Sequence, residues 1–123
     1  MDKKRILLVD DDHLYREILD SYLNLILDCQ VVSVANGQAA LSQLQQQSFD
    51  LLLTDYHMPD MNGLILAEAA RQIIPDIPVV LMTGAHNGRE IYNRLCSLNR
   101  IGFLAKPFYI TQLKDILQNN GII

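Results

Sequence analysis

The sequence has little of what marks several common functions. Tryptophan is absent, and the 123 residues include five tyrosines and three phenylalanines. With so few aromatic side chains, a platform for stacking single-stranded nucleic acid is not expected. The formal net charge is −4, so the chain also lacks the positive charge that binding a phosphate backbone requires. We therefore expect no direct contact between this domain and nucleic acid.

Long apolar runs and closely spaced cysteines are also missing. No run approaches the length of a membrane span, and the basic start, Lys3-Lys4-Arg5, is followed by an apolar run at residues 6–9 that is too short for a secretory signal. Cys29 and Cys96 form no C-x-x-C motif, which favours reduced thiols, although a bond between them stays open. These absences predict a cytoplasmic protein without membrane insertion.

What the sequence does contain is typical of one folded domain. Half of the residues are apolar, a fifth are charged, and glycine and proline are few, which argues against disorder and collagen-like repeats. A chain of 123 residues is long enough to enclose a hydrophobic core. Because no linker or low-complexity segment interrupts it, we expect residues 1–123 to form a single domain.

Apolar segments alternate with segments of helical periodicity. The predicted strands are residues 6–9, 30–35, 51–55, 78–83 and 102–106. The predicted helices lie around residues 14–25, 38–47, 64–74, 91–99 and 110–117. Five strands alternating with five helices predict right-handed strand–helix–strand units, and therefore an α/β fold with a doubly wound parallel sheet covered on both faces.

Particular residues predict where these elements begin and which faces they bury. Asp12 is well placed as the N-cap of the first helix. The pair Asn36-Gly37 predicts a turn after the second strand. Apolar residues at helical spacing predict one apolar face on the first helix: Leu14, Ile18, Tyr22 and Leu25.

Several predicted strands end in a residue that can take part in chemistry. The first ends in Asp10 and Asp11, the third in Asp55, the fourth in Thr83 and the fifth in Lys106. In a parallel sheet these ends share one edge. Converging carboxylates repel one another unless a cation lies between them, and oxygen ligands favour Mg²⁺. With the charge of Lys106 and the hydroxyl of Thr83, this pattern predicts a site that holds a phosphoryl group on Asp55.

Four short motifs occur in order at these strand ends. They are V-D-D at residues 9–11, T-D-x-x-M-P-x-M-N-G at 54–63, M-T-G at 82–84 and K-P-F at 106–108. Together they resemble the response-regulator receiver domains of two-component signalling, over essentially the whole chain. The resemblance implies a flavodoxin-like sheet with strand order 2-1-3-4-5. It also implies a phosphoacceptor that is not a multiple-turnover enzyme.

The resemblance implies a role for each acidic residue. Asp55 would accept a phosphoryl group from a histidine kinase or from a phosphotransfer histidine. Asp11 would bind Mg²⁺ directly and Asp10 mainly through water, while Asp55 and the backbone carbonyl of His57 would complete the ligand set.

The resemblance also implies how the site would signal. Thr83 and Lys106 would each contact a phosphoryl oxygen. Phe103 would turn inward when Thr83 is drawn to the phosphoryl group, which would change binding to an attached or separate output module. His57 and Ala85 occupy positions that in receivers influence the lifetime of the acyl phosphate.

Two other functions remain as alternatives. The run Asp10-Asp11-Asp12 also fits a phosphatase of the haloacid-dehalogenase type with Asp10 as the nucleophile, and Thr83 and Lys106 would occupy suitable later positions. Against this, the next acid after Lys106 is Asp115 within a predicted helix, and no cap insertion is present. The second alternative is a pseudo-receiver that takes no phosphate and acts only as an interaction module.

Further hypotheses concern the surroundings of the site. Three histidines in loops at the same edge, His13, His57 and His86, would suit a transition metal, but the carboxylates favour a hard ion. By analogy with the family, one surface would face a kinase helical bundle: Leu14, Tyr15, Ile18, Pro107 and Phe108. A second set is expected to form either an output surface or core, with core favoured for the third and fourth: Tyr92, Phe103, Leu95 and Ile110.

Overall fold

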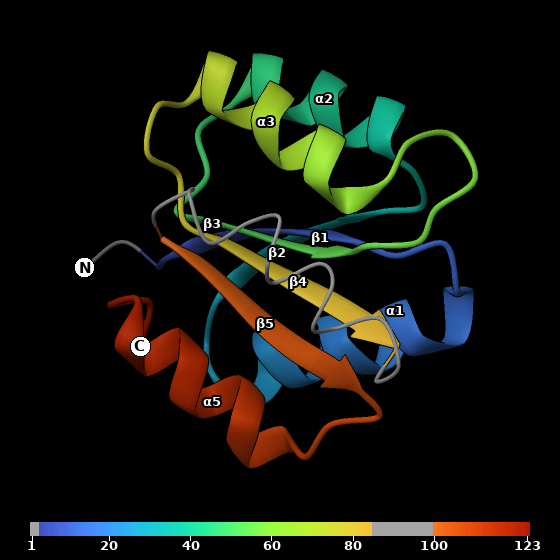
Figure 1. Cartoon of the computed structure of the whole chain (residues 1–123). Helices are drawn as coiled ribbons and strands as arrows, with labels where there is room; N and C mark the ends of the chain where they lie inside the picture. Colours follow the sequence, from blue (N-terminus) through green and yellow to red (C-terminus); the bar gives the residue numbers. More distant parts are fainter. Residues whose placement is uncertain (1–2, 85–99) are drawn as a thin grey trace.

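A computed structural model describes residues 3–84 and 100–123 of the chain. Its strands are β1 (Arg5–Val9), β2 (Gln30–Val34), β3 (Leu51–Asp55), β4 (Val79–Gly84) and β5 (Ile101–Lys106). They form one sheet in the order β2-β1-β3-β4-β5, and all neighbouring pairs are parallel. The α/β fold and the strand order 2-1-3-4-5 are confirmed (Figure 1).

Helices cover both faces of this sheet. The described helices are α1 (His13–Ser21), α2 (Gly37–Gln46), α3 (Gly63–Ile73) and α5 (Ile110–Asn119), and a π-helical turn, η1 (Tyr22–Ile26), continues α1. Figure 1 shows α2 and α3 on one face and α1 and α5 on the other. The helix predicted around Ile91, Leu95 and Leu98, together with Tyr92, lies outside the described residues.

The sheet separates two hydrophobic layers. Leu51 and Leu53 of β3 pack with Leu19 and Leu113 on the side of α1 and α5, whereas Leu52 belongs to the layer under α2 and α3. All three leucines are fully buried. Because successive side chains of a strand point to opposite faces, a strand covered on both sides must be apolar throughout. The unbroken leucine run follows from this arrangement.

The starts of α1 and α2 test the predicted cap at Asp12 and the predicted turn at Asn36-Gly37. The backbone N–H of Tyr15 donates to Asp12 Oδ1 at 3.1 Å, so the predicted N-cap is confirmed. Asn36 does not form the predicted turn with Gly37. Asn36 has an extended backbone and accepts from the N–H of Ala39 at 2.8 Å, and Gly37 is the first residue of α2. The strand-to-helix connection is too short to hold a separate turn.

The predicted apolar face of α1 is wrong for three of its four residues, whereas the fourth, Tyr22, is half-buried and packs against the layer on the side of α1 and α5. Leu14, Ile18 and Leu25 are 66%, 55% and 79% exposed, and Leu19 and Leu23 are buried against the sheet instead. Both sets repeat at near-helical spacing, so periodicity alone does not decide which set faces inward. The consequence is a row of exposed apolar side chains along α1 and η1.

Two single-residue predictions also have an outcome. Ile110 is 39% exposed rather than part of the core, because α5 packs through Leu113 and Leu117, which are fully buried. Cys29 is a buried free thiol, as expected, and Cys96 lies outside the described residues.

Candidate functional site

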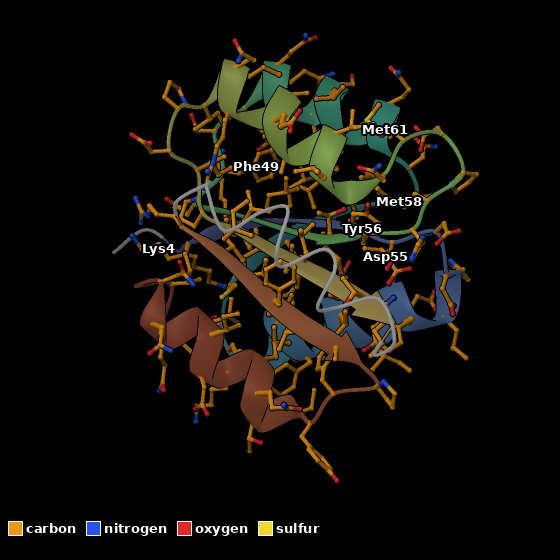
Figure 2. All side chains as sticks on the ribbon, viewed as in Figure 1. Lys4, Phe49, Asp55, Tyr56, Met58 and Met61 are labelled. Atoms are coloured by element: carbon orange, nitrogen blue, oxygen red, sulfur yellow. The ribbon has the colours of Figure 1, made fainter. Side chains whose placement is uncertain are left out.

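Three carboxylates converge at the edge where β1 and β3 end. Asp10 and Asp11 follow β1, and Asp55 is the last residue of β3; one oxygen from each lies within 4.8 Å of the others. Asp10 is fully buried and Asp55 is 9% exposed. Figure 2 shows Asp55 at this edge of the sheet. The structure thus brings together the three acids that the sequence predicts to meet.

The segment after Asp55 folds back at once. The backbone N–H of Gly63 donates to the carbonyl of Tyr56 at 2.8 Å, and Asn62 caps α3 by accepting from the N–H of Ile65 at 2.9 Å. A Cβ at Gly63 would lie 2.7 Å from the carbonyl oxygen of Asp55. Only glycine permits this approach without a shift of the backbone. The conspicuous N-G pair therefore holds the start of α3 against the end of β3.

Asp60 ties the same loop to α2. Its carboxylate accepts the backbone N–H groups of Gly37 at 3.2 Å and Gln38 at 3.0 Å. Slight burial raises the pKa of Asp60, but the hydrogen bonds from Gln38 and Gly37 outweigh this, and the pKa is lowered. The positive end of the helix dipole favours the same charged form. The sequence carries no local signal for this contact, because it joins two segments more than twenty residues apart.

Lys106 pairs more closely with Asp10 than with Asp55. Its Nζ lies 2.8 Å from Asp10 Oδ2 and 3.5 Å from Asp55 Oδ1. The other carboxylate oxygen of Asp10 accepts the backbone N–H of Asp12 at 2.9 Å. Both oxygens of Asp10 are therefore engaged, as a buried charge requires. The carboxylate of Asp55 is therefore held less closely by Lys106 than the carboxylate of Asp10 is.

Tyr15 adds an aromatic ring to this cluster. The Nζ of Lys106 lies 4.3 Å from the centroid of the Tyr15 ring. The Phe108 ring meets Tyr15 edge to face, at 6.0 Å between centroids and 86° between planes. Burial, followed by the nearby charges of Asp10 and Asp55, raises the pKa of Tyr15 to about 12. Its phenol therefore stays neutral beside the carboxylates.

The electrostatics of the cluster favour a bound cation. Burial raises the pKa of Asp55 to about 6; Lys106 opposes this, whereas Asp10 and Asp11 add to it. The attraction of Lys106 therefore does not offset the burial of Asp55 together with the repulsion from its two acidic neighbours. A donor set made only of carboxylate oxygens suits a hard divalent ion such as Mg²⁺.

The fourth and fifth strands contribute the other predicted residues. Thr83 is buried near the end of β4, where it pairs in register with Ala105 of β5. Phe103, three residues before Lys106, is half-buried and packs on the layer under α2 and α3. Thr83 and Lys106 therefore reach the same edge as Asp55, while Phe103 lies further back along β5.

Neither His13, which is the first residue of α1 and not in a loop as predicted, nor His57 belongs to the carboxylate cluster. His57 is exposed, and its ring meets Tyr56 edge to face at 4.9 Å. His13 lies 3.3 Å from Glu17 and 3.1 Å from Arg16. Within residues 3–84 and 100–123, the group with metal-ligand spacing contains no histidine, which disfavours the transition-metal hypothesis. Ala85 and His86 lie outside the described residues.

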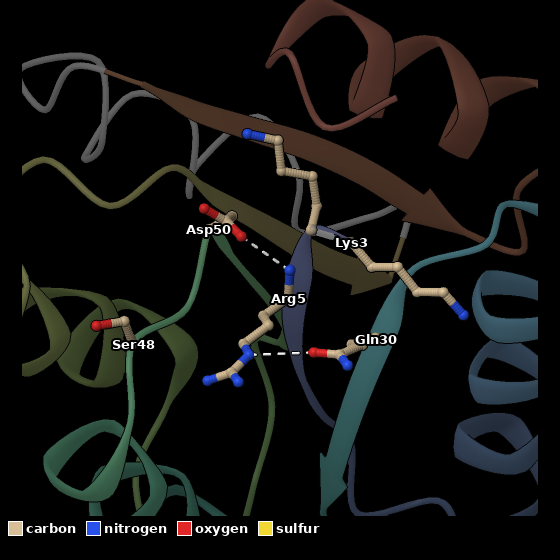
Figure 3. Close-up of a pocket in the computed structure, with 6 residues that line it drawn as sticks. Lys3, Arg5, Gln30, Ser48 and Asp50 are labelled. Atoms are coloured by element: carbon tan, nitrogen blue, oxygen red, sulfur yellow. Dashed lines mark hydrogen bonds between the residues drawn. The ribbon is translucent and has the colours of Figure 1, made fainter. Parts of the chain in front are cut away.

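The opposite edge of the sheet carries a polar hollow (Figure 3). Its lining residues are Lys3, Lys4, Arg5, Gln30, Ser48 and Asp50. The backbone N–H of Arg5 donates to Asp50 at 2.8 Å, and the Arg5 guanidinium donates to Gln30 at 3.1 Å. The hollow is lined by three cationic side chains and one carboxylate, so it lacks the converging acidic groups that a divalent cation requires.

Comparison with known proteins identifies the family. Residues 6–118 match the response regulator receiver domain, and the chain belongs to this family of two-component signalling domains. It is 36% identical over 118 residues to the putative two-component response regulator ARR21 of Arabidopsis thaliana, which covers 94% of this chain and 19% of that protein. It is 42% identical over 81 residues to the response regulator receiver protein CpdR of Brucella abortus, covering 66% of this chain and 67% of CpdR.

Solved structures agree with this assignment. The chemotaxis protein CheY4 of Vibrio cholerae matches with a TM-score of 0.87 and 27% identity, over 96% of this chain and 98% of CheY4. The chain spans less than a fifth of the length of ARR21. None of the helices in the described part of the chain has the length and hydropathy needed to cross a bilayer.

Proposed function

We propose that this receiver domain, residues 1–123, accepts a phosphoryl group on Asp55 from a histidine kinase or a phosphotransfer histidine and uses Mg²⁺ to do so. The observation that carries the proposal is the cluster at the ends of β1 and β3. There Asp55 lies with Asp10 and Asp11, and its carboxylate is 3.5 Å from the ammonium of Lys106. The resemblance in sequence motifs and the family membership support the same residue.

The proposed reaction is a transfer followed by hydrolysis. A carboxylate oxygen of Asp55 attacks phosphorus, the bond from phosphorus to the donor histidine nitrogen breaks, and that nitrogen keeps the electron pair and takes a proton from solvent. Water later attacks phosphorus, which releases inorganic phosphate and restores the Asp55 carboxylate. Since Asp55 itself is modified in the first step, the domain is a phosphoacceptor and not an ordinary multiple-turnover enzyme.

The carboxylates divide the proposed ligand roles. Asp11 and Asp55 would hold Mg²⁺ directly, with the backbone carbonyl of His57 as a further ligand. Asp10 would act through water, because both of its oxygens already accept from Lys106 and Asp12. The ion would supply positive charge to the phosphoryl oxygens, and Lys106 would pair with one of them.

The proposed output runs through β4 and β5. Thr83 would donate its hydroxyl to a phosphoryl oxygen, and the side chain of Phe103 would then turn inward, which changes the surface offered to an attached or separate output module. Direct contact with nucleic acid is not part of the proposal. The proposed compartment is the cytoplasm, consistent with the free thiol of Cys29.

The geometry weighs against the phosphatase alternative. A nucleophilic Asp10 would need a free oxygen facing substrate, but Asp10 is fully buried and its two oxygens accept from Lys106 and Asp12. The pseudo-receiver alternative would leave the converging carboxylates without a cation or a phosphoryl group to hold.

One labelling experiment separates the three functions. The protein is incubated with acetyl phosphate and Mg²⁺, and any acyl phosphate is trapped with borohydride and located by mass spectrometry. We expect label on Asp55, no label in Asp55→Asn, and unchanged labelling in Asp50→Asn, a matched change at the opposite edge. Label on Asp10 with steady turnover of a phosphate ester would instead support the phosphatase. Folded protein without label would support the pseudo-receiver.

A further inference from the structure

Three side chains from the described part of the chain lie close to the ammonium of Lys106. Two are carboxylates: Asp10 at 2.8 Å and Asp55 at 3.5 Å. The third is the face of the Tyr15 ring, 4.3 Å from ring centroid to Nζ. That distance lies within the range in which a cation is attracted to an aromatic face. Tyr15 comes from α1 and Lys106 from the end of β5, so the contact joins elements on separate parts of the chain.

The two kinds of neighbour differ in what else they must do. Asp10 and Asp55 are members of the candidate cation cluster, and Asp55 is also the proposed phosphoacceptor. Both carboxylates therefore have competing partners during the reaction. The ring of Tyr15 has no such competition, because an aromatic face binds neither Mg²⁺ ligands nor a phosphoryl oxygen. It is the neighbour that stays available to Lys106 throughout.

Lys106 needs such a constraint. Its side chain is a flexible four-carbon stem, and it is 22% exposed, so an ammonium released by a carboxylate would spread over many rotamers. The Tyr15 ring is itself held, because α1 carries it and Phe108 packs edge to face against it. Phe108 lies only two residues beyond Lys106, so the ring is bracketed by the ammonium and by a neighbour in the same segment.

We propose that Tyr15 is a positioning residue for phosphoryl transfer, whose ring holds the Lys106 ammonium over the carboxylate cluster so that it can pass from Asp10 to a phosphoryl oxygen on Asp55. This inference rests on the proposed function for its catalytic consequence. The contact itself does not depend on that function, so the two can be tested separately.

The contact is tested by nuclear magnetic resonance on the whole chain. A proton above an aromatic face is shifted upfield, so the ε-methylene protons of Lys106 are expected upfield in wild type. We expect the same shift in Tyr15→Phe, which keeps the ring, and its loss in Tyr15→Leu, both with and without Mg²⁺. If Tyr15→Leu does not fold, Tyr15→Met provides an unbranched replacement. Identical Lys106 resonances in wild type and in the ring-less variant would overturn the proposal.

The consequence for the reaction is tested by the rate of labelling with acetyl phosphate at saturating Mg²⁺. Loss of the ring is expected to slow labelling about three- to tenfold, as suits a cation–π contact at a partly buried site. The Mg²⁺ dissociation constant should not increase, because the ring touches no proposed ligand directly and its loss weakens a competitor for Asp10. If Tyr15 had a merely structural role, loss of its ring would both slow labelling and increase the Mg²⁺ dissociation constant.

A double-mutant cycle assigns the effect to Lys106. In a Lys106→Ala background, Tyr15→Leu is expected to cause no further slowing. As a single substitution, Tyr15→Phe should label at close to the wild-type rate. Slowing of equal size in both backgrounds, or a Tyr15→Phe variant as slow as Tyr15→Leu, would overturn the proposal. Absence of label on Asp55 in the wild-type protein would overturn the proposed function alone, and the resonances of Lys106 would still decide the role of Tyr15.

Discussion

The two edges of the sheet arrange their charged groups in different ways. At the edge where the strands begin, Lys3 pairs with Asp28 at 3.0 Å and Arg5 bonds to Asp50 and Gln30. Lys3 thus has a carboxylate partner, and both the backbone and the guanidinium of Arg5 are hydrogen-bonded. At the edge where the strands end, three carboxylates converge, and two of them lie close to Lys106. The first arrangement joins segments that are distant in the sequence, whereas the second leaves negative charge uncompensated.

The difference shows how a site can be recognised without a ligand. A surface ion pair contributes little and is easily replaced. Carboxylates that are buried together raise the free energy of the folded state unless something binds them. The charged form of Asp55 is unfavourable for this reason, since burial and its acidic neighbours raise its pKa to about 6. An arrangement that is unfavourable alone is explained by the cation and phosphoryl group that it is proposed to hold.

The largest expected effect is on the rate of labelling, which should depend on the cation at one edge of the sheet and not on the cation at the other. Lys106→Ala should slow labelling of Asp55 by acetyl phosphate about a hundredfold, because it removes a charge aimed at the phosphoryl oxygens. Arg5→Ala, the matched cation at the other edge, should leave the rate within about twofold, as expected for a surface group. The measurement is the initial rate of phosphoprotein formation by intact-mass spectrometry. Equal slowing in both variants would contradict the distinction.

Stabilisation of the protein by Mg²⁺ should depend on the carboxylate cluster and not on the acidic residues at the other edge. At a hundredfold excess over its dissociation constant, the ion is expected to raise the free energy of unfolding of wild type by about 2.7 kcal/mol. Asp11→Asn should lose most of this gain, and Asp28→Asn at the other edge should keep it. Urea titrations with and without Mg²⁺ measure the difference. A full gain in Asp11→Asn would exclude Asp11 as a ligand.

Asp55→Asn should stabilise the protein in the presence of EDTA. The pKa of Asp55 rises from 3.8 to about 6 on folding, so between these values the folded state binds more protons, and wild-type stability falls as pH rises. The asparagine variant escapes this loss. After allowance for solvent screening, its advantage should be about 1–2 kcal/mol at pH 7 and vanish near pH 4.

Asp50→Asn provides the matched control for that pH series. Its carboxylate accepts the backbone N–H of Arg5 at 2.8 Å, so the variant should be slightly less stable than wild type at pH 7. Urea titrations between pH 4 and pH 7 compare the two variants. A stability of Asp55→Asn that follows wild type at every pH would show that Asp55 carries no buried-charge cost.

The smallest expected effect concerns the lifetime of the acyl phosphate. His57 is exposed beside Tyr56, two residues beyond Asp55, and we expect its ring to hinder the approach of water to Asp55. His57→Ala should admit water more readily and shorten the lifetime about threefold. His57→Asn should fall between the two, and Ser48→Ala at the opposite edge should have no effect. Decay of trapped label in Mg²⁺ buffer measures this; unchanged decay in both His57 variants would remove the hypothesis.

The sequence predicts the strands and the meeting of the carboxylates for one physical reason. Buried parallel strands must be apolar throughout, and their ends must share an edge, so the position of Asp10 and Asp55 follows from the runs that precede them. The cap at Asp12 is equally local, since a helix start depends on a few neighbouring residues.

What the sequence does not predict depends on how helices rotate about their own axes. Leu14 and Ile18 repeat at the same spacing as Leu19 and Leu23, and only packing selects the second pair for burial. The same rotation brings Tyr15 to Lys106. Side-chain contacts between distant segments, such as Asp60 with the start of α2, likewise have no periodic signal.

The double burial of β3 has a consequence for the dynamics of signalling. This strand is hydrogen-bonded to β1 and β4 and lies between both hydrophobic layers, so exposing its amides requires both layers to open. Its amide hydrogens should exchange only through global unfolding, while those of the edge strand β2 exchange through smaller openings. Asp55 therefore belongs to one of the segments of the described chain that we expect to open last, and the phosphoryl group would be carried on a rigid support.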